Sequence, residues 1–343
     1  MSLRSISQRI LFSGSLLISP YLAADLVVLQ YHHVSDRTPP ATSTSVALFD
    51  AQMDMISRLE MTVVPLEEGT RDALSGSLGE QNQIALSFDD AYESVYTNAA
   101  PILSAHGYPF TIFVNTNAVG SPGYMTWEQL EDLAANDQVT LANHSTDHGH
   151  LARRPDEPKA TWRQRIEVSL DQAQETLATE LGTTEPLFAY PYGEFDQALE
   201  KEIAHRGWFG YGQQSGAIGP ASSSTRLPRF PMADAYGQLN GLKDKLMSRA
   251  LPVPADQLPD GVIGQNPPAL TFDLPPSISA DRLNCFASGM GRIDFEVKNG
   301  RAKIQAPRAF NSRRFRYNCT HPAGNGRFYW LSQQWLDLSK PED

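Results

Sequence analysis

Two pairs of residues in this chain have the types and spacing that a catalytic metal site requires. Asp89 and Asp90 are adjacent, and His144 and His148 are four residues apart. Imidazoles at that spacing can point at one ion, and imidazole with carboxylate suits zinc and neighbouring divalent metals. Three protein ligands leave a position open for a water molecule that becomes a nucleophile near neutral pH. Alone, the acids could cap a helix and the histidines could be solvated, but together the pairs indicate a hydrolase.

A third motif, Tyr190-Pro191-Tyr192-Gly193, also follows an apolar run. Proline and glycine fix a turn there, and a backbone N–H of that turn could stabilise an oxyanion during attack on a carbonyl. The aromatic residues could line a sugar-binding groove, although core packing is the usual fate of tyrosine.

All three motifs come directly after apolar runs that we predict to be strands. Between residues 26 and 250, short apolar runs alternate with helix-patterned segments, as in a parallel sheet covered by helices. The carboxyl ends of such strands meet at one rim, where α/β barrels place their chemistry. We therefore predict an α/β fold with a barrel, complete or incomplete. Its strands are expected at Leu26–Tyr31, Met61–Val64, Ile84–Phe88, Phe110–Val114, Val139–Ala142, Leu187–Tyr190 and Trp208–Tyr211, with the clearest helix at Ala160–Leu181.

The N-terminus predicts export. Residues 1–24 place arginines ahead of an apolar stretch that ends in small residues, as in a secretory signal peptide. A membrane anchor is the alternative, but the stretch is shorter than the ~20 residues that span a bilayer. We expect a periplasmic or secreted protein without a stable membrane span after cleavage.

The C-terminal third has a different character from the barrel. Residues 251–276 are rich in proline and read as a linker, whereas residues 277–343 alternate apolar and polar residues, with a hairpin turn at Asn299-Gly300. Cys285 and Cys319 are the only cysteines, and we expect them to form a disulfide in an oxidising compartment rather than remain free thiols. The small β module would either bind carbohydrate through its aromatic residues or form a sandwich around them.

Composition limits the partners. Hydrophobic residues make up 41% of the chain and charged residues 20%, which allows a sizeable core. The net charge of −11 disfavours nucleic acid, because phosphate backbones are bound by basic surfaces. A neutral or cationic ligand fits better. The sequence leaves the oligomeric state open.

The three motifs, in this order and spacing, resemble those of the polysaccharide deacetylase family, the NodB-homology or carbohydrate esterase family 4 enzymes, over roughly residues 26–232. The resemblance implies a distorted (β/α) barrel of about seven strands and metal-dependent removal of acetyl groups from N-acetylated sugars. It also implies a general base at Asp89, an oxyanion hole at the backbone of Tyr192, and metal ligands at Asp90, His144 and His148.

Two departures from the family pattern stand out. Ala189 replaces the arginine that usually orients the base, and Arg226 or Arg229 could approach the site instead. Arg229, Tyr190 and Pro191 are our candidates for substrate contacts. The late histidine that serves as general acid has no match near residues 243–251.

A replacement acid lies at the other end of the chain. The apolar run 26–31 ends in His32 and His33, which resembles the opening of the poly-N-acetylglucosamine deacetylase branch. In a barrel the first and last strands are neighbours, so His32 can reach the same rim and protonate the leaving amine. His33 is the second choice, and a histidine packed at the strand end is the alternative to both.

These observations predict an exported deacetylase that acts on an N-acetylglucosamine-containing polysaccharide with one divalent metal ion, for which Zn²⁺ is the first choice. Nickel, cobalt and iron suit the same ligands. Peptidoglycan, chitin fragments and O-acetylated xylan are further candidate substrates. A glycan-binding protein that has lost turnover is the alternative function, although a retained base at Asp89 argues against it.

Overall fold

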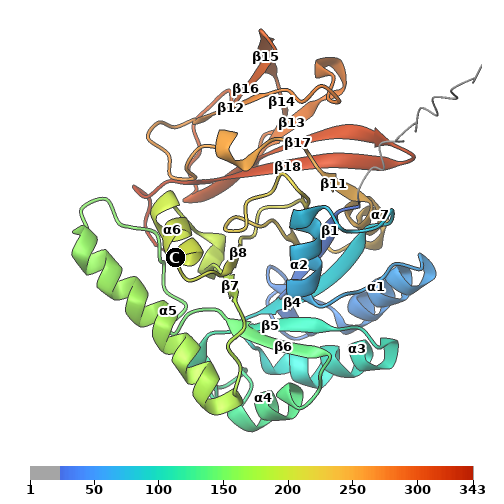
Figure 1. Cartoon of the computed structure of the whole chain (residues 1–343), viewed down its shortest axis with the longest axis vertical. Helices are drawn as coiled ribbons and strands as arrows, with labels where there is room; N and C mark the ends of the chain where they lie inside the picture. Colours follow the sequence, from blue (N-terminus) through green and yellow to red (C-terminus); the bar gives the residue numbers. More distant parts are fainter. Residues whose placement is uncertain (1–23, 343) are drawn as a thin grey trace, which may run out of the picture.

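The computed structural model describes residues 24–342, so residues 1–23 of the expected signal peptide lie outside the described residues. Figure 1 shows a curled sheet flanked by helices, with the later strands of the chain gathered at one end of it, at the top of the view. The described helices include none with the length and hydropathy needed to cross a bilayer.

The curled sheet is an open half-barrel with parallel neighbours along its path. In spatial order its strands are β10 (Phe230–Pro231), β1 (Leu26–Tyr31), β4 (Gln83–Asp89), β5 (Phe110–Val114), β6 (Val139–Asn143), β7 (Leu187–Ala189) and β8 (Phe209–Tyr211). A short strand, β9 (Ala217–Ile218), pairs antiparallel with β1. Tyr211 of the edge strand β8 forms a parallel bridge with Leu227, in the segment that precedes the other edge strand, β10. The predicted distorted barrel of about seven strands is confirmed.

The sheet strands form because their side chains are buried on both faces. Every residue of β1 and of β5 is buried, which explains why these strands read as continuous apolar runs. The helices that cover them are α1 (Val46–Arg58), α2 (Leu66–Ser75), α3 (Ala100–His106), α4 (Trp127–Ala134), α5 (Lys159–Leu181), α6 (Gln197–His205) and α7 (Leu239–Leu246). Two short strands, β2 (His33–Val34) and β3 (Ser43–Thr44), pair beside the rim.

Most of the expected elements are present at nearly the expected bounds. Helix α5 ends at Gly182, which takes the left-handed conformation with φ 68° that glycine favours. One expected strand, residues 61–64, is wrong: only a single bridge joins Val63 to Ile84. The segment contributes Met61 and Val63 to the core without extending the sheet.

The C-terminal part consists of two antiparallel sheets around their own core. The larger sheet has the order β11 (Ser248–Ala250), β18 (Arg327–Leu336), β17 (Arg314–Gly324), β13 (Asn284–Ala287) and β14 (Gly291–Ile293). The smaller sheet has the order β12 (Ala269–Asp273), β16 (Arg301–Gln305) and β15 (Phe295–Lys298). The hairpin at Asn299-Gly300 is confirmed, with both residues at positive φ. The disulfide is confirmed as well, and it joins Cys285 to Cys319 across β13 and β17.

The segment expected to be a linker is instead part of this β region. Residues 251–276 contain β12, and Leu251, Val253, Leu270 and Phe272 are buried in the C-terminal core. Strand β11, which lies inside the expected barrel range, pairs in parallel with β18. The apolar residues between the prolines decide the structure, because they find partners in β16 and in the core. The barrel and the β region are therefore continuous.

Candidate active site

Asp90, His144 and His148 converge at the rim of the half-barrel. Asp90 follows β4, and His144 follows β6, two strands away in the sheet. The Nε2 atoms of His144 and His148 lie 3.5 Å and 3.3 Å from Asp90 Oδ1. One ligand atom from each of the three side chains lies within 4.8 Å of the others. Positive φ angles at Asp90 and His148, 75° and 51°, turn the chain sharply so that both side chains reach the shared point.

These three residues fit a divalent metal ion. His144 Nδ1 donates a hydrogen bond of 2.8 Å to the carbonyl oxygen of Ala189, which leaves Nε2 unprotonated and directed at Asp90. His144 Nε2 and Asp90 Oδ1 are both buried and have no hydrogen-bond partner, although buried polar atoms almost always have one. Burial lowers the pKa of His144 to about 3, which favours the neutral, ligating imidazole. Burial and the charge of Asp89 raise the pKa of Asp90 to about 6, the mark of a carboxylate that lacks a compensating cation.

Asp89, the residue before Asp90, is held by hydrogen bonds from two side chains, those of Arg229 and Gln30. Arg229 binds it bidentately, with Nη1 2.7 Å from Oδ1 and Nη2 2.9 Å from Oδ2. Gln30 Nε2 donates a third hydrogen bond of 2.6 Å to Oδ2. Burial alone would raise the pKa of Asp89, but the charges of Arg229 and His144 and the hydrogen bond from Arg229 outweigh it and hold that pKa below its usual range.

Arg229 therefore occupies the position next to the base that Ala189 leaves without an arginine. We had expected Arg229 to touch substrate, but its side chain is fully buried and donates from Nε to the carbonyl of Gly212. The guanidinium of Arg229 cannot reach a bound substrate, because it is buried and paired with both carboxylate oxygens of Asp89. Arg226, the other candidate, pairs with Glu200 instead, with its Nε 2.8 Å from Oε1.

A cavity of about 890 Å³ opens in front of the metal ligands. The barrel supplies one wall, and strands β17 and β18 of the C-terminal sheet supply the opposite wall, as their position across the end of the half-barrel in Figure 1 suggests. Residues on the barrel wall include Gln30, His32, Asp90, Tyr92, His148 and Tyr192, and residues on the other wall include Arg314, Arg316, Asn318, Trp330 and Gln334. A sugar chain in this cavity would touch both parts of the protein.

Comparison with known sequences identifies the part of the chain that carries the motifs. Residues 78–208 match the sequence model of the family described as polysaccharide deacetylase. These residues form a polysaccharide deacetylase domain. The four metal-site and base residues and the turn at Tyr192 all lie within it, whereas His32, Arg229 and the C-terminal sheets lie outside its bounds.

Relatives of the deacetylase domain extend beyond those bounds. Poly-beta-1,6-N-acetyl-D-glucosamine N-deacetylase of Escherichia coli (strain K12) is 23% identical over 261 residues, covering 63% of this chain and 38% of the relative. The enzyme of the same name from Staphylococcus epidermidis is 24% identical over 200 residues, covering 56% of this chain and 68% of the relative. The chain thus spans well under half the length of the Escherichia coli protein.

Solved structures share the fold of the deacetylase domain. IcaB from Ammonifex degensii superposes with a TM-score of 0.56 and 22% identity, covering 65% of this chain and 96% of that one. The Streptococcus pyogenes deacetylase PplD, solved in complex with acetate, superposes with a TM-score of 0.55 and 20% identity over 62% of this chain and 93% of that one. More than a third of the chain lies outside each of these superpositions.

The structure separates the two adjacent histidines before the deacetylase domain. His32 lines the cavity together with Asp90 and His148. His33 points elsewhere: its ring stacks on Tyr92 with centroids 3.6 Å apart, and Ser94 Oγ lies 3.5 Å from its Nδ1. Burial and the charge of His32 lower the pKa of His33 to about 4.

Tyr190 and Pro191, which we expected to contact substrate, are both buried and do not line the cavity. The hydroxyl of Tyr190 donates a hydrogen bond of 2.7 Å to the carbonyl of Thr225, and its ring packs on Phe188 and Phe195. The positive φ of Tyr192 turns the chain directly after Tyr190. Tyr190 therefore faces the core, whereas Tyr192 faces the cavity.

The turn at Tyr192 is fastened to the C-terminal sheet. Tyr192 and Gly193 have φ angles of 57° and 67°, and a side chain at Gly193 would collide with Gln213. The carbonyl of Gly193 accepts a hydrogen bond from Gln334 of β18. The ring of Tyr192 stacks on His150 at 4.1 Å, and Arg314 of β17 lies over it at 5.2 Å. A non-glycine residue held in this conformation needs such support from its surroundings.

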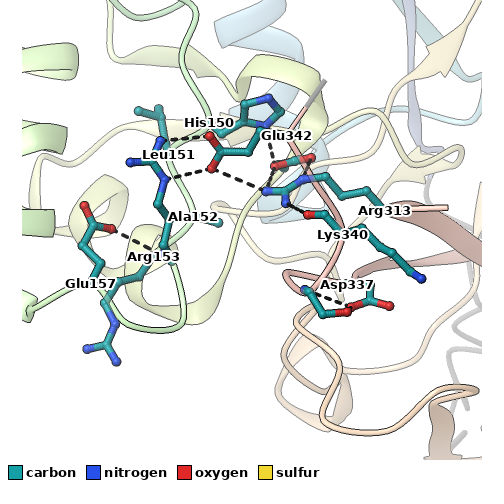
Figure 2. A network of polar contacts seen from close by, with 12 residues as sticks. His150, Leu151, Ala152, Arg153, Glu157, Arg313, Asp337, Lys340 and Glu342 are labelled. Atoms are coloured by element: carbon teal, nitrogen blue, oxygen red, sulfur yellow. Dashed lines mark hydrogen bonds and ion pairs between the residues drawn. The ribbon is translucent and has the colours of Figure 1, made fainter. Parts of the chain in front are cut away.

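Glu194, directly after this turn, forms the ion pairs that hold the turn against the C-terminal sheet. Its fully buried carboxylate accepts hydrogen bonds from Arg313 at 2.8 Å and 3.1 Å, from Arg314 at 2.8 Å and from His150 at 2.9 Å. Figure 2 shows Arg313 between the loop of His150 and the C-terminal segment, where it also donates to the carbonyl of Lys340. Burial would raise the pKa of Glu194, but the hydrogen bonds from both arginines and from His150 lower it.

Sequence reasoning missed Gln30, Glu194 and the arginines of β17 as parts of this site. A signal existed for Gln30, because a lone amide inside an apolar strand must find a buried partner. No comparable signal marks Arg313 or Arg314, whose partner lies more than a hundred residues earlier in the chain.

The Asp89 and Arg229 pair can be tested through its pH dependence. In an Arg229→Gln variant the buried carboxylate loses its compensating charge, and the free energy of unfolding should fall by about 3–5 kcal/mol at neutral pH. The pKa of Asp89 should then rise, so the folded variant takes up a proton as the pH falls. The difference in free energy of unfolding between the wild type and the variant should therefore shrink between about pH 7 and about pH 5. Urea denaturation at several pH values measures both effects.

The matched control is the double variant Asp89→Asn/Arg229→Gln, which removes both charges and leaves no uncompensated ion. It should be more stable than the Arg229→Gln variant alone at neutral pH. Equal stability of the single and double variants would contradict the assignment of Arg229 as the partner that keeps Asp89 ionised.

Proposed function

We propose that the chain is an exported, metal-dependent deacetylase that hydrolyses N-acetyl groups of an N-acetylglucosamine-containing polysaccharide. The observation that carries this proposal is the arrangement of Asp90, His144 and His148 beside a base, Asp89, at the wall of a cavity large enough for sugar units. The names of the Escherichia coli and Staphylococcus epidermidis relatives support the choice of polymer. The N-terminal sequence supports a periplasmic or secreted location.

Asp90, His144 and His148 would hold the ion, with Zn²⁺ as the first choice. A bound divalent ion supplies a Lewis acid that lowers the pKa of water and polarises the acetyl carbonyl. The protein contributes the geometry: the hydrogen bond from His144 to Ala189 fixes one imidazole, and the tight turn at Ser145 to His148 brings the second within reach of Asp90.

Asp89 acts as the general base. Its carboxylate is ionised because Arg229 pairs with both oxygens, and Gln30 restricts its rotation from the side of β1. A base held in this way accepts a proton from water without first losing its orientation. Arg229 and Gln30 are positioning residues, since they act through Asp89.

The backbone of Tyr192 would donate to the oxyanion that forms on the acetyl group. Such a donor is effective only when it is already aimed at the developing charge. The contacts of Gly193, Glu194 and the Tyr192 ring with β17 and β18 provide that rigidity. His32, on the same cavity, would protonate the leaving amine, which is a poor leaving group without a proton.

A glycan-binding protein without turnover is the alternative. Two features of the sequence supported it: an alanine at position 189 where the family has an arginine, and the absence of a late histidine. Arg229 pairs with Asp89 as the missing arginine would, and His32 lines the cavity as the missing histidine would. The geometry therefore favours a deacetylase.

The proposed reaction predicts acetate release from N-acetylglucosamine oligosaccharides. A chelator should abolish it, and added Zn²⁺ should restore it. An Asp89→Asn variant keeps the metal ligands and loses the base, so its kcat should fall by about 100- to 10,000-fold while its metal content, measured by elemental analysis, stays the same. Binding of the oligosaccharides without metal-dependent acetate release from the wild type would favour the glycan-binding alternative.

The two adjacent histidines form a matched pair for testing the general acid. His32→Ala should lower kcat by about 100-fold or more, because it removes the proton donor from the cavity. His33→Ala should change kcat much less, because His33 stacks on Tyr92 outside the cavity. Both variants should retain metal. A larger loss in the His33→Ala variant than in the His32→Ala variant would reverse the assignment.

The contacts that hold the Tyr192 turn against β17 and β18 predict a further effect on kcat. Arg313→Gln removes two hydrogen bonds from Glu194, so the Tyr192 N–H should lose its aim and kcat should fall by about tenfold or more, with KM nearly unchanged. Arg154→Gln is the control, because Arg154 lies nearby and pairs with Glu342 through exposed side chains. Equal kinetics for both variants, or a change confined to thermal stability, would refute a role for Arg313 in catalysis.

A further inference from the structure

Strand β17 directs a row of polar side chains into the cavity, opposite the metal ligands. Alternate residues of a strand face the same side, and along β17 the residues Arg314, Arg316 and Asn318 line the cavity while Tyr317 and Cys319 are buried in the C-terminal core. The disulfide at Cys319 and the hydrogen bonds of Tyr317 therefore fix the row from behind. This wall lies outside the part of the chain that matches the deacetylase family.

Arg316 is a cation without an acidic partner. Its Nη1 donates a hydrogen bond of 2.9 Å to the carbonyl of Gln213, and within residues 24–342 it makes no ion pair with a carboxylate at 4.0 Å or less. Arg314, two residues earlier, differs because it has a carboxylate partner, Glu194, which it shares with Arg313. Burial lowers the pKa of Arg316, and a smaller effect of the Tyr236 hydroxyl opposes it.

Lys245 of α7 is a second cation of this kind. Its Nζ donates a hydrogen bond of 2.5 Å to the carbonyl of Tyr236, and among the described side chains no carboxylate forms an ion pair with it. Burial lowers its pKa against a smaller opposing effect of Asp244. Arg316 and Lys245 thus both lie near Tyr236: Arg316 interacts electrostatically with its side chain, and Lys245 donates to its backbone carbonyl.

The cavity differs in charge from the rest of the chain. The chain carries a net charge of −11, yet Asp90 is the only acidic residue among the described residues that line the cavity. Asp90 belongs to the metal site and cannot also neutralise the opposite wall. Arg316 and Lys245 are half-buried, line the cavity and form no ion pair with a described carboxylate, so an anionic group bound there would gain a charge-assisted hydrogen bond from each of them. Asn318 Oδ1, also buried without a partner, adds an acceptor for a sugar hydroxyl.

Tyr236 provides a surface for a sugar ring at the same place. It is 68% exposed although it lines the cavity, and exposed aromatic rings pack well on the apolar faces of sugars. An aromatic platform close to two cations suits a sugar that carries a negative charge. A neutral sugar would use the platform and leave both cations without a counter-charge.

We propose that Arg316, Lys245, Asn318 and Tyr236 form a subsite for an acidic sugar unit of the polysaccharide, next to the N-acetylated unit that is hydrolysed. The anionic group is a carboxylate, as in a uronic acid, or a phosphate ester. This inference rests on the proposed deacetylase function and narrows its substrate to polymers in which N-acetylglucosamine alternates with, or adjoins, an acidic unit. It also revises the expectation of a neutral or cationic ligand, which followed from the net charge alone.

The test compares oligosaccharides of equal length with the full chain loaded with Zn²⁺. One contains only N-acetylglucosamine, one alternates N-acetylglucosamine with glucuronic acid, and one carries phosphate on a primary hydroxyl. The wild type should release acetate from at least one acidic oligosaccharide with a kcat/KM about tenfold or more above that of the neutral one at low salt. The acidic oligosaccharide that is preferred identifies the anionic group.

The variants locate the effect. Arg316→Gln and Lys245→Gln should each raise KM for the acidic oligosaccharide by about tenfold and leave kcat and the neutral oligosaccharide nearly unchanged. Arg308→Gln is the matched control, because Arg308 is exposed in the same β region and does not line the cavity. Circular dichroism and thermal melting check that each variant folds.

Two results would overturn the subsite. The first is an equal kcat/KM for neutral and acidic oligosaccharides, and the second is an equal loss on both types in the Arg316→Gln variant. If no oligosaccharide releases acetate, the proposed deacetylase function fails separately. Calorimetry then measures the affinity of the wild type and of the Arg316→Gln variant for the acidic oligosaccharides, which tests the subsite independently of the reaction. Unchanged affinity in the variant refutes the subsite, and weakened affinity supports it.

Discussion

A carboxylate that is fully buried and yet ionised is the constraint on which the site depends. Asp89 keeps its charge only because Arg229 covers both of its oxygens and Gln30 adds a third hydrogen bond. These three residues come from β4, from the start of β10 and from β1, which are neighbours in the sheet. The half-barrel must therefore be assembled before Asp89 can be buried as an ion, because a buried charge without its partner would be strongly unfavourable.

The open side of the half-barrel gives the C-terminal sheets their role. Strand β8 forms a bridge with Leu227 in the segment before β10 and does not pair with β10 itself, and β17 and β18 lie above the barrel in Figure 1. They hold the Tyr192 turn through Glu194 and Gly193 and supply the far wall of the cavity. The region expected to be a separate module therefore contributes to the wall of the cavity. Along β17, Arg314, Arg316 and Asn318 line the cavity, whereas Tyr317 and Cys319 pack in the C-terminal core.

Local pattern predicted most of the barrel because local physics determines it. Strands β1 and β5 are buried on both faces and so read as unbroken apolar runs, and α5 ends where Gly182 can adopt a left-handed conformation. The prediction was wrong where pattern and environment disagree. Residues 61–64 are apolar enough for a strand but join the sheet by one bridge, and β12 forms within a proline-rich segment because its partner, β16, lies about thirty residues later.

The sequence by itself determined which residues gather at the candidate site, since Asp89, Asp90, His144, His148 and Tyr192 each come at or after the end of an apolar run and strand ends of a parallel sheet share one rim. Only the tertiary structure decided which side chains support them. Arg229 lies 140 residues from Asp89, and Arg313 lies 119 residues from Glu194. It also decided which of His32 and His33 lines the cavity, because neighbouring residues at a strand end face opposite ways and nothing in the sequence says which way is the cavity. Residue types are a local property, whereas the partners of a buried charge are set by how distant segments pack.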